Sequence, residues 1–125
     1  MAFLDPIIVR PLLNGIDWEL QREVRYATNV GNVIYIPAGF ITDFASIPWF
    51  FRRIFQPATG KHRRAAVVHD WLYRTSTEPY TKEESDLIFL EIMKDDGVSK
   101  MAREVLYNSV KFGGSSSYVR REDNG

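Results

Sequence analysis

The hydrophobic pattern of the chain changes its period once, near residue 61, and this change limits the possible folds more than any other feature. Before it, short β-branched and aromatic runs alternate with polar residues, and Val33–Ile36 is the clearest of them. Alternation of this kind favours strands. After it, apolar residues recur at helical spacing. Strands first and helices after them predict an α+β domain, with a small N-terminal antiparallel β-sheet packed against a C-terminal bundle of three helices.

The first strands are predicted around a turn. An alternating run over residues 18–26 and the run at 33–36 flank a segment rich in Asn and Gly at 28–32. Two such runs on either side of a turn predict a β-hairpin. We therefore expect both runs to pair within one sheet.

Start and stop signals mark the three helices. The first is expected over residues 62–74. Thr81 followed by Glu84 is a capping-box pattern, which predicts the start of the second helix; that helix should stop before Gly97. Ser99 is the expected N-cap of a third helix of about 13 residues.

Length and composition indicate one globular domain. The chain has 125 residues, of which 45% are hydrophobic and 14% aromatic, enough to form a core without disulfides or metals. We assign this domain to residues 1–114 and expect the Ser-rich, charged segment 115–125 to be a flexible tail. The sequence holds no cysteine, which excludes a disulfide scaffold, a thiolate metal site and a cysteine nucleophile within it. Neither a transmembrane segment nor a signal peptide is expected.

A histidine within an apolar helix is the most informative feature for function. His69 lies in the apolar run 65–73 and shares a helix face with Tyr73. The short connection at 76–80 predicts that the first two helices form an antiparallel hairpin. His69 and Asp86 are equally far from its midpoint, about 9 Å along each helix, and should face each other. A carboxylate at this place can fix the imidazole tautomer and leave the other nitrogen as a general base.

The pattern His69-Asp70-x-x-Tyr73, followed by Asp86 on the next helix, resembles the catalytic signature of secreted and parvoviral phospholipases A2. The resemblance implies a calcium-dependent lipid esterase that acts on a phospholipid or another ester. His69 is then the base that activates water, Asp86 orients it and Tyr73 supports Asp86. Asp70 is the implied calcium ligand. That family also supplies carbonyl ligands from a glycine-rich loop, for which Gly60 is the one candidate glycine here.

A second resemblance covers more of the chain. The segments 42–48 (Thr-Asp-Phe-Ala-Ser-Ile-Pro) and 69–73 (His-Asp-Trp-Leu-Tyr), together with Asp86, are similar to an uncharacterised domain family common in tailed-phage genomes. The similarity extends over about residues 18–112. It implies a phage origin, and with it a location in the virion or the host cytoplasm, but no particular activity.

Other interpretations of the polar residues stay open. The His69–Asp70 region is explained equally by a structural network that ties the helix hairpin to the Asp43 loop, or by a ligand site without catalysis. Asp43 and Ser46 can cap a turn through nearby backbone amides, or Asp43 can be an extra metal or substrate ligand. A Ser46–His69–Asp86 triad is conceivable, although no Gly-x-Ser-x-Gly elbow presents the serine.

A basic stretch with aromatic residues between its charges is a candidate interface. Such a surface suits an anionic lipid, a partner protein or nucleic acid, or is simply the solvated edge of the core. Nucleic acid ranks last, because 16 basic and 16 acidic residues give a net charge of zero. The candidate interface residues are Arg52, Arg53, Arg63 and Arg64.

Two hypotheses of function follow. The first is a phage-encoded, calcium-dependent ester hydrolase with a phospholipase A2-like site, acting in envelope passage or lysis. The second is a non-catalytic virion protein of the tail or tail tip, or an assembly protein, whose His/Asp network is architectural and whose partners are other phage virion proteins.

Overall fold

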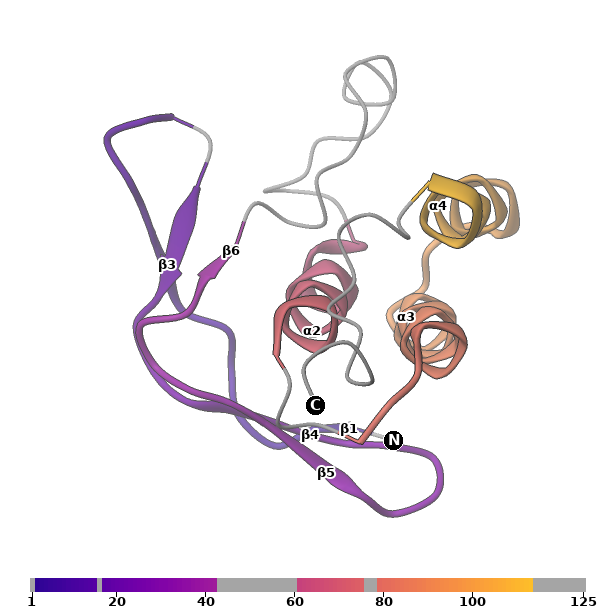
Figure 1. Cartoon of the computed structure of the whole chain (residues 1–125), viewed down its shortest axis with the longest axis horizontal. Helices are drawn as coiled ribbons and strands as arrows, with labels where there is room; N and C mark the ends of the chain where they lie inside the picture. The colour runs from indigo at the N-terminus through magenta and orange to yellow at the C-terminus, as the bar shows by residue number, and fades with distance from the viewer. Residues whose placement is uncertain (1, 16, 43–60, 76–78, 114–125) are drawn as a thin grey trace, which may run out of the picture.

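The computed structural model of the chain describes residues 2–15, 17–42, 61–75 and 79–113 (Figure 1). Within them, all strands precede all helices, which confirms the predicted α+β class. The strands are β1 (Ala2–Phe3), β2 (Val9–Pro11), β3 (Trp18–Leu20), β4 (Val24–Ala27), β5 (Val33–Ile36) and β6 (Ile41–Thr42). The helices are α2 (Arg63–Arg74), α3 (Lys82–Asp95) and α4 (Lys100–Gly113). None of these helices is long and apolar enough to cross a membrane.

The strands form two antiparallel sheets of three strands each, ordered β1-β4-β5 and β2-β3-β6. The expectation of one sheet was wrong, because the run 18–26 is divided between them. Gln21, Arg22 and Glu23 are all exposed and interrupt the alternation. The chain leaves β3 there and enters β4 in the other sheet.

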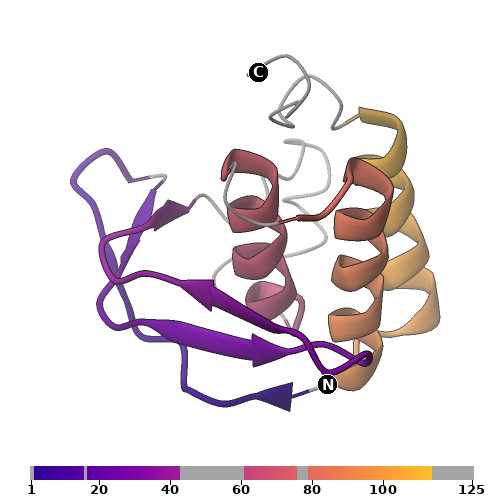
Figure 2. The same cartoon turned by 60° about the horizontal axis from the view of Figure 1, so that its bottom comes forward.

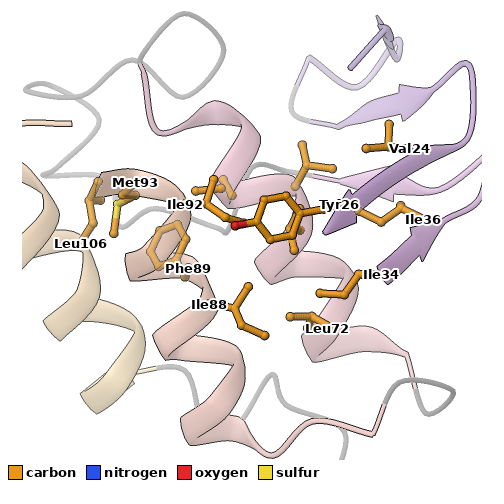
Figure 3. Packing of buried hydrophobic residues seen from close by; sticks show 14 of the residues in the cluster. Val24, Tyr26, Ile34, Ile36, Leu72, Ile88, Phe89, Ile92, Met93 and Leu106 are labelled. Carbon is orange, nitrogen blue, oxygen red and sulfur yellow. The ribbon is translucent and has the colours of Figure 1, made fainter. Parts of the chain in front are cut away.

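The β4–β5 hairpin was predicted correctly, although its first strand is shorter than expected. Tyr26 is opposite Ile34, and Val24 is opposite Ile36. The turn is closed by the Thr28 amide, which donates to the Asn32 carbonyl at 2.8 Å. The inward side chains of both strands point toward the helices and form one side of the core (Figure 3).

The helices form successive layers on the sheets (Figures 1 and 2). α2 lies between the sheets and α3, while α4 is the outermost helix and packs on α3. The core between these layers is apolar: Leu72, Ile88, Phe89 and Ile92 are all buried. This packing fixes α2 and α3 side by side, which is what positions the polar residues between them.

The helix limits agree closely with the sequence signals. The capping box is present: the Glu84 amide donates to Thr81 Oγ1 at 3.1 Å, and the Thr81 amide donates to Glu84 Oε1 at 2.9 Å. Gly97, with φ of +81°, follows α3 in the left-handed conformation that favours glycine. Ser99 caps α4 by accepting from the Ala102 amide at 3.2 Å.

Candidate functional site

The predicted pairing of His69 with Asp86 is confirmed. The two residues face each other across the α2–α3 hairpin, with His69 Nε2 2.9 Å from Asp86 Oδ1. Tyr73, one turn after His69, donates its hydroxyl to the same oxygen. The distance of His69 and Asp86 from the loop and the four-residue spacing of His69 and Tyr73 therefore predicted three side chains that the fold brings together.

Lys82 is a fourth member of this network that was not predicted from the sequence. Lys82 Nζ donates to Asp86 Oδ2 at 2.9 Å, so both carboxylate oxygens are occupied. The same ammonium donates to the carbonyls of Val110 at 3.2 Å and Lys111 at 3.0 Å, in the last turn of α4. The i, i+4 spacing of Lys82 and Asp86 was a signal for the ion pair. The link to α4 had no local signal.

The network is buried and held by aromatic rings. His69 is 3% exposed and Asp86 2%. The imidazole lies against the rings of Tyr73 and Phe89, at centroid distances of 4.0 and 4.8 Å. These contacts fix the orientation of the ring, so the hydrogen bond to Asp86 is made by a side chain that has little freedom to turn.

The charge states follow from this environment. Burial opposes ionisation of Asp86, but the hydrogen bonds from His69, Tyr73 and Lys82 outweigh it and hold its pKa below the ordinary value. Burial, helped by the Lys82 charge, lowers the pKa of His69 despite the bond to Asp86. His69 is therefore a neutral imidazole whose Nε2–H donates to a carboxylate. No residue that the structure describes bonds its Nδ1, which is left as the acceptor nitrogen.

These shifts predict a protein that loses stability in acid. With the pKa of His69 lowered by folding, the unfolded chain binds more protons below about pH 6.5, so stability falls as pH falls. The expected slope is at most about 1.4 kcal/mol per pH unit for each such histidine. His62, whose pKa is also lowered by burial, adds to it. The lowered pKa of Asp86 adds a further loss below about pH 3.8.

Urea unfolding between about pH 8 and about pH 5 measures this slope. His69→Gln removes one titrating group, and the slope of this variant should be the smaller of the two. A wild-type stability that does not change over this range contradicts the charge states assigned to the network.

Asp70 lies apart from this network and is already paired with a cation. Arg74 Nε is 2.9 Å from Asp70 Oδ1, and the same guanidinium donates to the Ile41 carbonyl of β6 at 3.1 Å. Within the described ranges, no three or more acidic or histidine side chains gather as a metal site. Calcium at Asp70 stays a prediction, and the ion would have to compete with Arg74 for this carboxylate.

A calcium titration by calorimetry tests this competition. We expect Arg74→Gln to bind calcium up to about five-fold more tightly than the wild type, because an ion pair whose arginine side chain is 44% exposed is worth about 1 kcal/mol or less. Asp70→Asn should not bind. Calcium binding that Asp70→Asn leaves intact contradicts a site at Asp70.

Several predicted site residues lie outside the described residues: Gly60, Asp43, Ser46, Arg52 and Arg53, as does the tail 115–125. The assignments made to them stay predictions.

The other two arginines of the predicted interface lie at the start of α2. Arg64 Nε donates to Asp96 Oδ2 at 3.0 Å, and its guanidinium lies 4.3 Å from the centre of the Phe3 ring. It therefore ties α2 to the end of α3 and to β1. Arg63 is partly buried beside it.

An open groove of about 310 Å³ lies elsewhere, between the β4–β5 turn and α3. None of its lining residues belongs to the network. They are Asn29, Leu87, Leu90, Glu91, Lys94 and Asp95.

Comparison with known proteins gives one relationship. No curated protein and no solved structure matches the chain. One family model, described as a protein of unknown function (DUF1353), matches residues 18–110. The match begins at β3, ends within α4 and includes His69, Tyr73, Lys82 and Asp86. The chain therefore belongs to DUF1353, a family of proteins of unknown function.

Proposed function

We propose that this chain is an ester hydrolase in which His69 is the general base. One observation carries the proposal: His69 Nε2 lies 2.9 Å from a carboxylate oxygen of the buried Asp86, and no described residue bonds Nδ1. This is the arrangement that water activation requires. The Tyr73 bond to Asp86 also agrees with what the phospholipase A2 resemblance implies.

The proposed reaction is a hydrolysis by direct attack of water. His69 Nδ1 takes a proton from a water molecule while the oxygen of that water forms a bond to the ester carbonyl carbon. The resulting imidazolium is stabilised by Asp86 through Nε2–H. When the tetrahedral intermediate collapses, the ester C–O bond breaks and His69 returns the proton to the leaving alkoxide. An acid and an alcohol are formed, and the imidazole is neutral again.

For the substrate, we propose a phospholipid or another ester, and for the source a tailed phage that uses the protein in envelope passage or lysis. The proposed substrate and the proposed source rest on the two motif resemblances. The family itself is of unknown function and supports neither.

The test is an assay of the purified chain on two substrates, vesicles of phosphatidylglycerol with phosphatidylcholine and a soluble nitrophenyl ester. Each is run with calcium and with a chelator. Hydrolysis that depends on His69 supports the proposal. His62→Gln is the matched control, because His62 is also buried but takes no part in the Asp86 network. Wild-type protein that hydrolyses neither substrate contradicts it.

A second candidate function is architectural, and the contacts of Lys82 favour it. One ammonium bonds Asp86 and two carbonyls of α4, so the network joins α2, α3 and α4. A network of this kind can have the fixing of helices as its whole role. The protein is then a virion or assembly protein, with a tail or tail-tip location and a phage protein as partner. Association of the chain with purified particles, with no hydrolysis, is the expected result for this function.

A further inference from the structure

The outermost helix, α4, has two apolar faces. One face packs on α3 through Leu106, which lies beside Met93 of α3 (Figure 3), and through Ala102 and Val110. A second row of side chains, here named the outer stripe, follows the other side of the helix at spacings of four, three and four residues. It consists of Met101, Val105, Asn108 and Phe112.

Three residues of the outer stripe are exposed, and Val105 is partly buried. Met101 is 77% exposed and Phe112 78%. Figures 1 and 2 show α4 at the edge of the molecule, with α3 as the neighbour on which it packs. Spacings of four and three residues are those of a coiled-coil seam, which packs against another helix. The helix that covers this stripe is therefore expected to come from another chain.

Charged residues beside the stripe indicate which helix fits. Glu104 and Lys111 immediately precede Val105 and Phe112, so both occupy the same heptad position on one flank. In an antiparallel pair of identical helices, equivalent flanks face each other. When Met101 lies opposite Phe112 of a second copy, Glu104 comes within reach of Lys111 of that copy, and the same pair forms again by symmetry.

A parallel pair does not reproduce this complementarity. There the position of Glu104 meets the opposite flank of the partner helix, which carries Ala102 and Ser109. The charges thus favour the antiparallel arrangement. In it, Val105 lies opposite Asn108 of the second copy, and a polar residue within a seam is the usual means of fixing one register.

We propose that the outer stripe of α4 pairs two copies of this chain in an antiparallel, two-fold symmetric dimer. The seam is short, since 14 residues of helix extend over about 21 Å. The interface is therefore small, and we expect a dissociation constant of about 1–100 µM. The affinity should fall with added salt, because the flanking ion pairs are exposed.

Sedimentation analysis of the full chain from about 1 µM to about 1 mM tests the proposal. Wild type should shift from monomer to dimer, and Met101→Glu with Phe112→Glu should be monomeric throughout. The control is Leu13→Glu with Val30→Glu, which adds the same two charges at exposed apolar residues of the β2–β3 and β4–β5 turns, and should dimerise like the wild type. A wild-type monomer over the whole range overturns the proposal, even if the stripe binds vesicles or another protein.

Charge reversal tests the antiparallel register independently of the apolar contacts. Glu104→Lys and Lys111→Glu place like charges opposite each other, and each should weaken the dimer by about three- to ten-fold. The double variant restores opposite charges and should recover most of the wild-type affinity. Circular dichroism of each variant serves as the check that it is folded. A double variant no tighter than either single variant overturns the arrangement.

Discussion

Replacing Asp86 by alanine is expected to lower the free energy of unfolding by about 3–5 kcal/mol, because it removes one partner of a buried ion pair. The Lys82 ammonium, whose side chain is 17% exposed, loses its only carboxylate among the described residues. The Tyr73 hydroxyl and His69 Nε2 lose their acceptor, the buried Asp86 carboxylate. Urea unfolding at about pH 8, where the network is fully formed, measures the loss.

Two further variants show which part of the network matters. Asp86→Asn keeps an oxygen that can accept a hydrogen bond but removes the charge. Its free energy of unfolding should therefore lie between those of the wild type and Asp86→Ala. Glu83→Ala removes an exposed carboxylate from the first turn of the same helix and should cost about 1 kcal/mol or less. If Asp86→Ala lowers the free energy of unfolding no more than Glu83→Ala does, the network does not stabilise the fold.

The centre of this network could be predicted from the sequence because an antiparallel hairpin with a short loop fixes which residues of its two helices face each other. Once the loop at 76–80 was recognised, helical rise and rotation placed His69 opposite Asp86. The capping box at Thr81 fixed where the second helix begins, and with it the register of the hairpin. Features that depend on short spacings along the chain could therefore be predicted.

Features that depend on packing between distant segments could not be predicted from the sequence. Residues 18–26 alternate well enough to predict one strand, but sequence alone does not show that three exposed polar residues divide it between two sheets. Lys82 bonds the end of α4 across 28 and 29 residues of chain, a contact without a local pattern. The two apolar faces of α4 look alike in the sequence, and only the fold shows that the one containing Leu106 is buried.

Replacing His69 by glutamine is expected to separate catalysis from stability. The amide nitrogen of Gln can take the place of imidazole Nε2 and donate to Asp86, but the side chain has no basic group in place of Nδ1. Any ester hydrolysis should fall by about 10²–10⁴-fold, the usual contribution of a general base. The unfolding free energy should change by only about 1–2 kcal/mol, since one charge-assisted hydrogen bond is kept and the ring contacts with Tyr73 and Phe89 are lost.

The same variant distinguishes the two proposed functions. In a hydrolase, His69→Gln loses its activity in the vesicle and nitrophenyl ester assays while its unfolding curve stays close to that of the wild type, and His62→Gln keeps its activity. In an architectural protein there is no activity to lose, and the variant associates with particles as the wild type does. Hydrolysis that persists at the wild-type rate in His69→Gln shows that the reaction occurs elsewhere on the chain. In that case the bond between His69 and Asp86 holds the helices together and does no chemistry.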